Sequence, residues 1–513
     1  MTPVPLAQVG PGQPGVRGHA LAAACPDAVC RGADVVITAL TADSRQVVPG
    51  SLFAALAGTR ADGRRFINDA LQRGAVAILD DGTWTPEPAQ ADRVCRIIHP
   101  EPRRGLSWLA AAFFAQPTRA LRMVGITGTN GKTTVAAMIA SILSHAGERV
   151  GVLGTTGHRW PGVERPSAMT TPDPIALQAL FAEMRAAGCS AAAMEVSSHA
   201  LDQRRVAAIR FDAAAFLNLT RDHLDYHGNE ENYFQAKARL FQPGQCARAA
   251  IHRDDARAEM LLEQCQAAAI PTLTFAIGEG ANRADLRARV DAMTWSGSRF
   301  DLLTPEGDLP IQLPVAGTVN IANALAAAAL ARQLEVGWAS IQAGLAAFAP
   351  PPGRMQTLEQ GQPFAVVVDY AHTPDALERL LRTARALTPG RLIVLFGCGG
   401  ERDTSKRPLM GQIAARLADT VILTDDNPRG EDPAAIRHGI REGVESVPEG
   451  AARCLEVADR EAAIARAFTL AGAGDAVLLA GKGHETGQVI AGRTLPFDDA
   501  EVARRRLGSP SSG

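Results

Sequence analysis

The chain has 513 residues, which is too long for a single hydrophobic core, so two to four domains are expected. Hydrophobic residues make up 46% of the chain and charged residues 21%, the composition of a globular protein. A net charge of −2 provides no basic surface for nucleic acid, so any anionic ligand must be held by local clusters of charge. The longest apolar segments, such as Ile321 to Leu330, are too short to span a bilayer.

The N-terminus and the cysteines bear on the cellular compartment. No basic stretch followed by an apolar core opens the chain, so a secretory signal is not expected. The eight cysteines are scattered without any C-x-x-C pairing, which favours reduced thiols and disfavours zinc. We therefore expect a cytoplasmic protein with no membrane span. We also expect a monomer.

The first 101 residues predict a small α/β domain. Residues 1–32 are rich in proline, glycine and alanine and are expected to include a loose tail. Polar loops at Thr41 to Arg45 and Gly58 to Arg65 follow strands, and ordinary solvated turns remain an alternative for both. The expected strands are Val35 to Leu40, Leu52 to Leu56, Ala75 to Leu79 and Val94 to His99.

The segment Leu121 to Thr134, LRMVGITGTNGKTT, organises the chain. A short apolar run suits a buried strand, a glycine-rich turn follows, and Lys132 opens a helical pattern through Leu143. Such a turn can aim backbone N–H groups at a phosphate, and the helix N-terminus adds partial positive charge. Lys132 would reach the β and γ phosphates, and the Thr133 hydroxyl would contact a bound Mg²⁺.

This motif departs from the usual G-x-x-x-x-G-K-[ST] spacing. That spacing would place a glycine at position 126, where the chain has Ile126, and Gly125 lies one residue early. An ordinary strand-to-helix turn with a solvated lysine is the alternative. The strand before and the helix after the turn favour phosphate binding.

The phosphate loop lies in a predicted central domain, residues 102–350. Alternating strands and helices imply a mainly parallel sheet covered on both faces, whose ligands bind at the carboxyl ends of the strands. A helix is expected at Arg104 to Phe114, and further strands at Val150 to Gly154, Ala191 to Val196, Ala213 to Leu217 and Ala249 to His252.

Three polar groups in this domain are candidates for a site. Glu195 ends an apolar strand, and it either emerges into water or provides a second ligand for the Mg²⁺ of a nucleotide. The phosphate loop in the same domain favours the second interpretation. Asn218 to His227 contains two histidines and two aspartates, either a metal site or a solvated turn. Lys237, on a short amphipathic helix at Tyr233 to Phe241, is expected on sequence alone to be a surface lysine.

A proline-rich break at Ala349 to Gly353 suggests a hinge before a third α/β domain, residues 351–513. This open, Rossmann-like domain has no G-x-G-x-x-G after its first strand, so a nicotinamide cofactor is not supported. Thr373 followed by Pro374 signals a helix start. Strands are expected at Phe364 to Val368, Leu392 to Phe396, Val421 to Leu423, Cys454 to Val457 and Ala476 to Leu479.

Four polar loops follow strands of the third domain and predict a site for a small, highly charged ligand. Arginine suits a carboxylate and acidic side chains suit an ammonium group, and an amino acid presents both. The loops are Asp369 to Pro374 (DYAHTP), Gly397 to Arg407 (GCGGERDTSKR), Asp425 to Arg429 (DDNPR) and Gly481 to Glu485 (GKGHE).

Taken in order, these motifs resemble the Mur ligases of peptidoglycan synthesis, in particular those that add meso-diaminopimelate to UDP-N-acetylmuramoyl-L-Ala-D-Glu. The resemblance covers roughly residues 42 to 485. The ordered set is TGTNGKTT, MEVSSHAL, DHLDYH, YFQAKARLF, DYAHTPDAL, GCGGERD, DNPR and GKGHE.

The resemblance implies an ATP-dependent ligase that forms an amide through an acyl phosphate. Its N-terminal domain would bind the UDP end of the substrate, its central domain ATP, and its C-terminal domain the amino acid. Lys132, His223 and Lys237 would be catalytic. Metal contacts to Mg²⁺ would come from Thr133, Glu195, His223 and Lys237, the last carbamylated, which would replace the surface-lysine interpretation.

The binding residues implied by the resemblance fall into three sets. ATP would contact Gly128, Thr129, Asn130, Gly131, Lys132, Thr133, Thr134, Asn320, Asn323, Arg354, Asp369 and His372. The UDP-sugar dipeptide would contact Ala42, Ser44, Thr59, Arg60, Ala61, Thr170, Thr171, Ser197, Gln203 and Arg205. Diaminopimelate would contact Arg402, Asp426, Asn427, Pro428, Arg429, Gly481 and Glu485.

Two departures and three rival functions remain. Met169 stands where relatives often carry asparagine before the two threonines, and the segment before Ala42 is weakly patterned. A lysine-adding ligase, a folylpolyglutamate synthase-like ligase and a non-catalytic nucleotide-binding homologue are the alternatives. DNPR argues against the first, DHLDYH and GKGHE against the second, and the intact set of Lys132, Glu195, His223 and Lys237 against the third.

Overall fold

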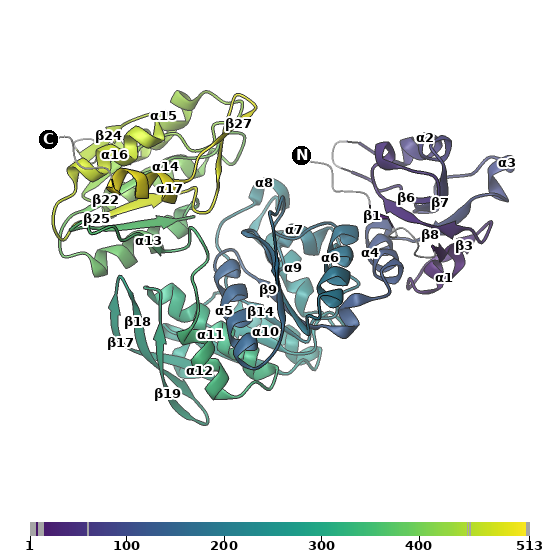
Figure 1. The fold of residues 1–513 in the computed structure, drawn as a ribbon, viewed down its shortest axis with the longest axis horizontal. Coiled ribbons are helices and arrows are strands. Elements are labelled where there is room, and N and C mark those ends of the chain that lie inside the picture. The colour runs from purple at the N-terminus through teal and green to yellow at the C-terminus, as the bar shows by residue number, and fades with distance from the viewer. Residues whose placement is uncertain (1–6, 9–14, 59–60, 449, 451–452, 509–513) are drawn as a thin grey trace.

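The computed structural model describes residues 7–8, 15–58, 61–448, 450 and 453–508. Three lobes follow one another along the chain, each built on its own sheet (Figure 1). The α/β fold class is confirmed.

The N-terminal lobe has a six-stranded sheet among the described residues, with β5 to β8 parallel and β1 and β3 antiparallel at the edges. Leu21, Leu52, Ile97 and Leu109 meet in its core. Part of residues 1–32, expected to include a loose tail, forms regular structure, because the apolar side of α1 packs on the sheet. The elements are β1 (Ala7–Gln8), β2 (Val16–Arg17), α1 (Gly18–Ala23), β3 (Val29–Arg31), β4 (Val36–Ile37), β5 (Ala39–Thr41), β6 (Ser51–Ala54), α2 (Ile67–Gln72), β7 (Ala75–Asp80), α3 (Pro88–Ala91), β8 (Cys95–Ile98) and α4 (Pro102–Phe113).

The central lobe contains an eleven-stranded sheet among the described residues, in the order β12-β11-β10-β13-β9-β14-β15-β16-β17-β18-β19. The strands from β10 to β17 in this order are parallel, and each edge ends in antiparallel strands. The strands are β9 (Arg122–Thr127), β10 (Val150–Gly154), β11 (Gly157–Trp160), β12 (Val163–Arg165), β13 (Ala191–Glu195), β14 (Ala213–Phe216), β15 (Ala249–His252), β16 (Thr272–Ala276), β17 (Leu286–Thr294), β18 (Gly297–Thr304) and β19 (Gly307–Leu313).

Helices cover both faces of this sheet, as a buried parallel sheet requires. Successive side chains of β9 point to opposite faces: Val124 joins the core under α5, α11 and α12, whereas Met123 joins the core under α6, α9 and α10. The helices are α5 (Lys132–His145), α6 (Pro174–Ala186), α7 (Ser198–Asp202), α8 (Leu224–His227), α9 (Glu230–Ala238), α10 (Ala258–Ala267), α11 (Thr318–Gln333) and α12 (Trp338–Ala346).

The C-terminal lobe has the strand order β20-β21-β25-β22-β23-β24, parallel except for β20. Helices α13 to α15 pack on one face and α16 and α17 on the other. The elements are β20 (Gln356–Thr357), β21 (Ala365–Asp369), α13 (Pro374–Leu387), β22 (Leu392–Phe396), α14 (Lys406–Leu417), β23 (Thr420–Leu423), α15 (Pro433–Glu445), β24 (Cys454–Glu456), α16 (Arg460–Leu470), β25 (Ala476–Ala480), β26 (Gly487–Ile490), β27 (Arg493–Pro496) and α17 (Asp499–Gly508).

Most predicted strands agree closely with these elements, but the predicted strand Val35 to Leu40 is divided between β4, which pairs with β2, and β5, which belongs to the six-stranded sheet. β15 and β22 have the predicted bounds, and Thr373 caps α13 by accepting a hydrogen bond from the Ala376 N–H at 3.3 Å. The strands β16 to β19 were not predicted. β17 to β19 lack the short apolar runs that marked the buried strands, whereas β16 is such a run, TLTFA, and was overlooked.

Candidate functional site

The phosphate loop connects β9 to α5. Gly131 has a φ of 90°, a conformation that favours glycine, and it precedes the first residue of α5. The Asn218 side-chain oxygen accepts a hydrogen bond from the Asn130 N–H at 2.9 Å, which holds the loop against the segment after β14. Lys132 Nζ donates to the carbonyls of Gly128 and Thr129, both at 2.8 Å.

The missing glycine of the phosphate motif has a simple explanation. Ile126 lies within β9, is fully buried and belongs to the core beneath α5. Gly125 has a packing role, because a Cβ there would stand 2.9 Å from the ring of Phe211. The turn itself begins only at Gly128, so position 126 needs a core residue.

Glu195 ends β13, the strand beside β9, and is 1% exposed. Its carboxylate accepts hydrogen bonds from the Thr155 N–H at 2.8 Å and the Thr155 hydroxyl at 3.1 Å. Burial lowers the pKa of Lys132, and the negative charges of Glu195 and Asp222 act in the opposite direction. Glu195 and Lys132 therefore belong to one electrostatic site.

The segment after β14 brings His223 to the same edge of the sheet. His223 has a φ of 54° and precedes α8, and its Nε2 lies 3.4 Å from Asp222 Oδ2. Burial lowers the pKa of His223 to about 4, so its imidazole is neutral at pH 7. His227 instead lies 3.0 Å from the Ser198 hydroxyl through its Nε2.

Lys237 is not a surface residue, so the interpretation from sequence alone was wrong. It is 1% exposed on α9, with its ammonium nitrogen 4.5 Å from the centre of the Tyr233 ring. Burial, reinforced by the positive charge of Lys132, lowers the pKa of Lys237 well below its ordinary value of 10.5. Within the described part of the chain, the ammonium group makes no hydrogen bond or ion pair, and the negative charges of Asp222 and Asp255 act against the effect of burial.

The described residues contain no group of three or more His, Cys, Asp or Glu side chains arranged to hold a metal ion. A Mg²⁺ ion bound with a nucleotide does not need such a cage, because phosphates and water supply most of its ligands. The Glu195 carboxylate and the Thr133 hydroxyl are the hard oxygen donors that this ion prefers, so the residues present fit it. Thr133 Oγ1 also lies 3.3 Å from Arg354 Nη2.

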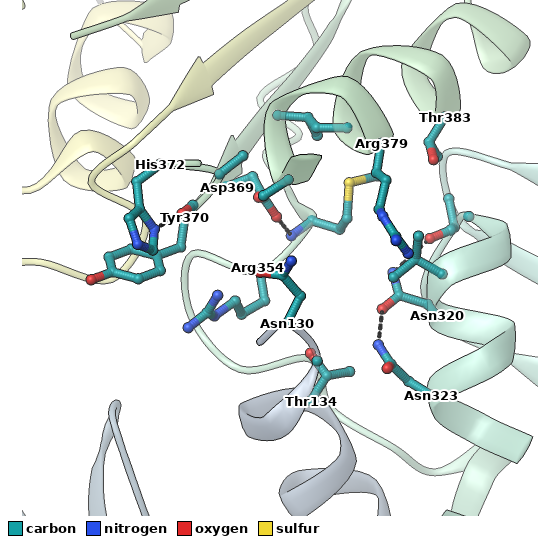
Figure 2. Close-up of a pocket in the computed structure, with 18 residues that line it drawn as sticks. Asn130, Thr134, Asn320, Asn323, Arg354, Asp369, Tyr370, His372, Arg379 and Thr383 are labelled. Atoms are coloured by element: carbon teal, nitrogen blue, oxygen red, sulfur yellow. Dashed lines mark hydrogen bonds between the residues drawn. The ribbon is translucent and has the colours of Figure 1, made fainter. Parts of the chain in front are cut away.

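A pocket lies between the central and C-terminal lobes, and all five residues predicted beyond the phosphate loop for ATP line it (Figure 2). Arg354 stacks on Tyr370 at 4.5 Å, and the Asp369 carboxylate accepts a hydrogen bond from the Met355 N–H at 2.7 Å. The lining side chains labelled in Figure 2 are Asn130, Thr134, Asn320, Asn323, Arg354, Asp369, Tyr370, His372, Arg379 and Thr383.

Burial sets the protonation of this pocket. It lowers the pKa of His372 to about 4 and raises the pKa of Asp369. Asn320 donates to the Ala316 carbonyl at 2.7 Å, and Asn323 donates to Asn320 Oδ1 at 3.3 Å, so the two amides form a joined polar wall on α11.

The phosphate loop contacts the C-terminal lobe directly. Asn130 Nδ2 donates to Asp375 Oδ2 at 3.0 Å, in the first turn of α13. Farther along the same face, Arg221 donates to the Ser405 hydroxyl at 3.2 Å. The phosphate loop and the loops of the C-terminal sheet therefore face one another.

Five residues predicted for the UDP substrate form one network in the central lobe. Thr170 bonds the Thr155 hydroxyl at 3.0 Å, and Thr171 donates to the Glu195 carbonyl at 2.8 Å. Arg205 donates to the Thr171 carbonyl at 2.6 Å and lies 3.4 Å from the sulfur of Met169. Thr171 also bonds Ser197, and Arg205 bonds Gln203.

The remaining predicted contacts for this substrate lie in the N-terminal lobe. Ala42 and Ser44 follow β5, and Ala61 lies before the turn at residues 63–66. Thr59 and Arg60 lie outside the described residues. Among the described residues, no hydrogen bond joins Ala42, Ser44 or Ala61 to the network in the central lobe.

The residues predicted for diaminopimelate gather at the carboxyl ends of β22, β23 and β25. Asn427 Nδ2 donates to Glu485 Oε2 at 2.7 Å, and Arg429 Nη1 donates to the Gly400 carbonyl at 2.6 Å. Asp426 is 7% exposed, and burial raises its pKa.

Gly481 and Arg402 complete this set. Gly481 has a φ of 107°, and a Cβ there would stand 2.8 Å from Asp426 Oδ2, so glycine is required on both counts. Arg402 is exposed beside the loop of Gly399. Pro428 directly precedes Arg429, and its carbonyl accepts a hydrogen bond from the Glu431 N–H.

The sequence interpretation missed Thr155, and it singled out the loops of Tyr370, Asp222 and Lys482 without naming these three residues. Thr155 and Tyr370 directly follow the ends of β10 and β21, which is where ligand contacts are expected in such sheets. Asp222 lies beside Lys132 and His223, and Lys482 contacts Asn427 and Glu485. Position after a strand was the available signal for Thr155, Tyr370 and Lys482.

In the part of the chain that the structure describes, no helix is both long and apolar enough to cross a membrane. Three family models match in succession: Mur ligase family, catalytic domain, at residues 36–114; Mur ligase middle domain, at 126–331; and Mur ligase, glutamate ligase domain, at 353–483.

The chain is also similar to named relatives over most of its length. A UDP-N-acetylmuramoyl-L-alanyl-D-glutamate--2,6-diaminopimelate ligase of Synechococcus elongatus is 44% identical over 488 residues, which cover 93% of this chain and 95% of the relative. One from Streptomyces coelicolor is 44% identical over 475 residues, 92% of each chain.

Solved structures agree with these relatives. A structure of a UDP-N-acetylmuramoyl-L-alanyl-D-glutamate--2,6-diaminopimelate ligase has a TM-score of 0.66 at 36% identity, over 91% of this chain and 94% of that one. A MurF structure from Acinetobacter baumannii, at 21% identity and a TM-score of 0.63 over 93% and 96%, shares the fold. The chain belongs to the Mur ligase family.

Proposed function

We propose that this protein is an ATP-dependent ligase that joins meso-diaminopimelate to UDP-N-acetylmuramoyl-L-Ala-D-Glu in peptidoglycan precursor synthesis. The observation that carries the proposal is the pocket shared by the phosphate loop and the loops of the C-terminal lobe. A nucleotide there would have its phosphates between an acid held by the central lobe and an amine held by the C-terminal lobe. Relatives bearing this name, 44% identical over 93% of the chain, support the choice of substrates.

The chemistry follows from the weak electrophilicity of a carboxylate. Transfer of the γ-phosphoryl group of ATP to the terminal carboxylate of the dipeptide forms an acyl phosphate and ADP. The amine then attacks the acyl carbon, the amide forms, and inorganic phosphate leaves. Protein side chains contribute mainly position and charge to phosphoryl transfer, which suits Lys132 and the N–H groups of the glycine-rich turn.

The nucleotide would be held by the phosphate loop and by Asn320, Asn323, Arg354, Asp369 and His372, which line one pocket. Arg354 is fixed on the Tyr370 ring and reaches Thr133, so it can bring positive charge to the phosphates. His372 is neutral at pH 7 and its Nδ1–H donates to the Tyr370 carbonyl at 2.8 Å, so it acts as a fixed polar group.

A Mg²⁺ ion would be held by Thr133, Glu195, His223 and a carbamylated Lys237. The ion would neutralise charge on the phosphates. The buried, unpaired amine of Lys237 suits carbamylation, since addition of CO₂ to the neutral amine releases a proton and creates a carboxylate. The carbamate would also carry negative charge beside Lys132, in place of an amine whose protonated form Lys132 repels.

The amine substrate would lie against the loops after β22, β23 and β25. Asp426 and Glu485 can receive an ammonium group, and Arg429 or Arg402 a carboxylate. Diaminopimelate carries a distal carboxylate that lysine lacks. A site built to bind that group rejects the analogue without it, because its buried polar groups lose their partner.

The three lobes would divide the work along the chain. Residues 1–101, on whose core α4 also packs, would hold the UDP end, 102–350 ATP, and 351–513 the amino acid. Closure of the lobes would keep water from the acyl phosphate. The proposed setting is the cytoplasm, where the nucleotide-linked precursor and ATP are available, and the proposed active species is a monomer.

Phosphate release tests this proposal. Protein, ATP, Mg²⁺ and the UDP-linked dipeptide are incubated with diaminopimelate, with lysine, or with neither. We expect release only with the dipeptide and diaminopimelate together. Phosphate release that prefers lysine would instead identify a lysine-adding ligase. Absence of acceptor-dependent release would favour a non-catalytic homologue. If a folate substrate then restored the release, the protein would be a folylpolyglutamate synthase-like enzyme.

A further inference from the structure

Arginine supplies almost all of the positive charge in this chain. Of the 52 lysine and arginine residues, only four are lysine. Lys132 and Lys237 belong to the proposed phosphate and metal site, and Lys406 donates to the His372 carbonyl at 2.8 Å beside the nucleotide pocket. The fourth, Lys482, follows Gly481 at the end of β25. A lysine suits places where a compact ammonium group with three rotatable donors is needed and a planar guanidinium is not.

The Lys482 side chain is completely enclosed, with 0% exposure. Its ammonium group donates to the Gly487 carbonyl at 2.7 Å and to Glu485 Oε2 at 3.2 Å, and it lies 3.5 Å from Asn427 Oδ1. A buried charge of this kind is costly unless its hydrogen bonds are made. Two of these contacts go to the loops of the proposed amino-acid site, and the third goes to the first residue of β26.

The groups that Lys482 contacts also bond one another. Asn427 Nδ2 donates to Glu485 Oε2 at 2.7 Å, and Asn427 Oδ1 accepts from the Val489 N–H at 2.9 Å. The Arg429 N–H donates to the Val489 carbonyl at 2.8 Å. Val489 of β26 therefore forms hydrogen bonds with two residues of the loop Asp426 to Arg429. Lys482 therefore joins the loop after β23, the loop after β25 and the start of β26.

Lys482 also sets the charge of the site. Asp426 and Glu485 are both acidic and repel one another. The positive charges of Arg460 and Lys482 oppose the effect of burial on Asp426. Arg460 is already paired with Asp499 through two hydrogen bonds of 2.7 Å, which leaves Lys482 as the cation that bonds Glu485 directly.

We propose that Lys482 is a positioning residue that orients Asn427 and Glu485 for the acceptor amino acid and thereby sets affinity and selectivity for diaminopimelate. This inference rests on the proposed function. Lys482 does not line the nucleotide pocket. Its loss acts on acceptor binding and leaves ATP binding intact.

The test compares steady-state kinetics of the wild type with Lys482→Met, which keeps the aliphatic stem and removes the charge. Arg493→Met, on the exposed β27 of the same lobe, is the matched control for loss of a cation. We expect Lys482→Met to raise the KM for diaminopimelate about tenfold or more, to change the KM for ATP less than about twofold, and to lower the preference for diaminopimelate over lysine about tenfold. Arg493→Met should match the wild type.

A second pair of variants separates positioning from folding. Thermal melting is recorded for every variant, and Lys482→Gln, which keeps a donor for the Gly487 carbonyl, replaces Lys482→Met if the latter does not fold. Lys482→Met combined with Glu485→Gln should cost less than the sum of the two single changes in kcat/KM for diaminopimelate, because both act through one contact.

Three results would overturn the inference. An unchanged KM and selectivity in Lys482→Met would show that Lys482 does not position the acceptor. Equal increases in the KM for ATP and for diaminopimelate, or failure of both Lys482 variants to fold, would assign it a general structural role. A wild type without diaminopimelate-dependent turnover would contradict the proposed function and this inference together, whereas normal wild-type turnover with an unaffected variant overturns the inference alone.

Discussion

Replacing Lys237 with methionine should make the protein more stable and inactive. The lysine is 1% exposed and has no hydrogen bond or ion pair among the described residues, so only the attraction of Asp222 and Asp255, neither within ion-pair distance, opposes the cost of burying its charge. Each unit by which a pKa is shifted corresponds to about 1.4 kcal/mol, so neutralising this lysine at pH 7, against its ordinary pKa of 10.5, costs at most about 5 kcal/mol. Methionine fills a similar volume without that cost, and a gain of about 1–4 kcal/mol is expected.

The pH dependence of this effect follows from the direction of the shift. The folded state holds the pKa of Lys237 below its unfolded value, so the unfolded state binds more protons between the two values. Wild-type stability therefore rises with pH in the window that ends near 10.5, and the advantage of Lys237→Met shrinks over the same window. The melting temperature of both proteins, measured from pH 7 to 10, gives the difference directly.

Activity and bicarbonate complete the test. Carbamylation would stabilise the folded wild type by mass action, so bicarbonate should raise its melting temperature and leave that of Lys237→Met unchanged. Phosphate release by the variant should fall on the order of 10²-fold or more, since a metal ligand is lost. A variant that melts at or below the wild-type temperature at pH 7 and retains full turnover would refute this reasoning.

Three further changes test other parts of the account. Lys132→Met should lower kcat for phosphate release on the order of 10³-fold, because it removes the cation at the phosphates, and an ADP assay would show normal turnover if this role were wrong. Arg429→Ala should raise the KM for diaminopimelate about tenfold or more and weaken discrimination against lysine; normal diaminopimelate kinetics would remove Arg429 from the site. Asp499→Ala should destabilise the C-terminal lobe by about 3–5 kcal/mol, because it leaves Arg460 buried without its partner, whereas Arg460→Met with Asp499→Leu should be near neutral in thermal melting.

The strands that the sequence predicted are short, apolar and mostly parallel, and these properties made them recognisable. Ala249–His252 and Leu392–Phe396 are apolar runs between turn residues, and the structure keeps their predicted bounds. The antiparallel strands β17 to β19 could not be recognised in the same way. They carry exposed charged side chains such as Arg289 and Asp301, so their pattern is that of a partly solvated edge.

The site residues were predictable only where a continuous stretch of sequence indicated them. The phosphate loop is continuous in sequence, whereas the burial of Lys237 depends on how α9 packs against residues far along the chain. Lys482 is similar: its neighbours in sequence indicate a loop, and its contact with Asn427 joins positions 55 residues apart. The order of the strands in the sheet creates these proximities.

The most direct test of the central claim follows the oxygen of the substrate acid. UDP-N-acetylmuramoyl-L-Ala-D-Glu labelled with ¹⁸O in its terminal carboxylate is turned over with ATP and diaminopimelate, and the released phosphate is analysed by mass spectrometry. If the carboxylate is activated as an acyl phosphate beside Lys132, one ¹⁸O atom appears in inorganic phosphate and ADP is the other product. Unlabelled phosphate, or formation of AMP and pyrophosphate, would contradict the account.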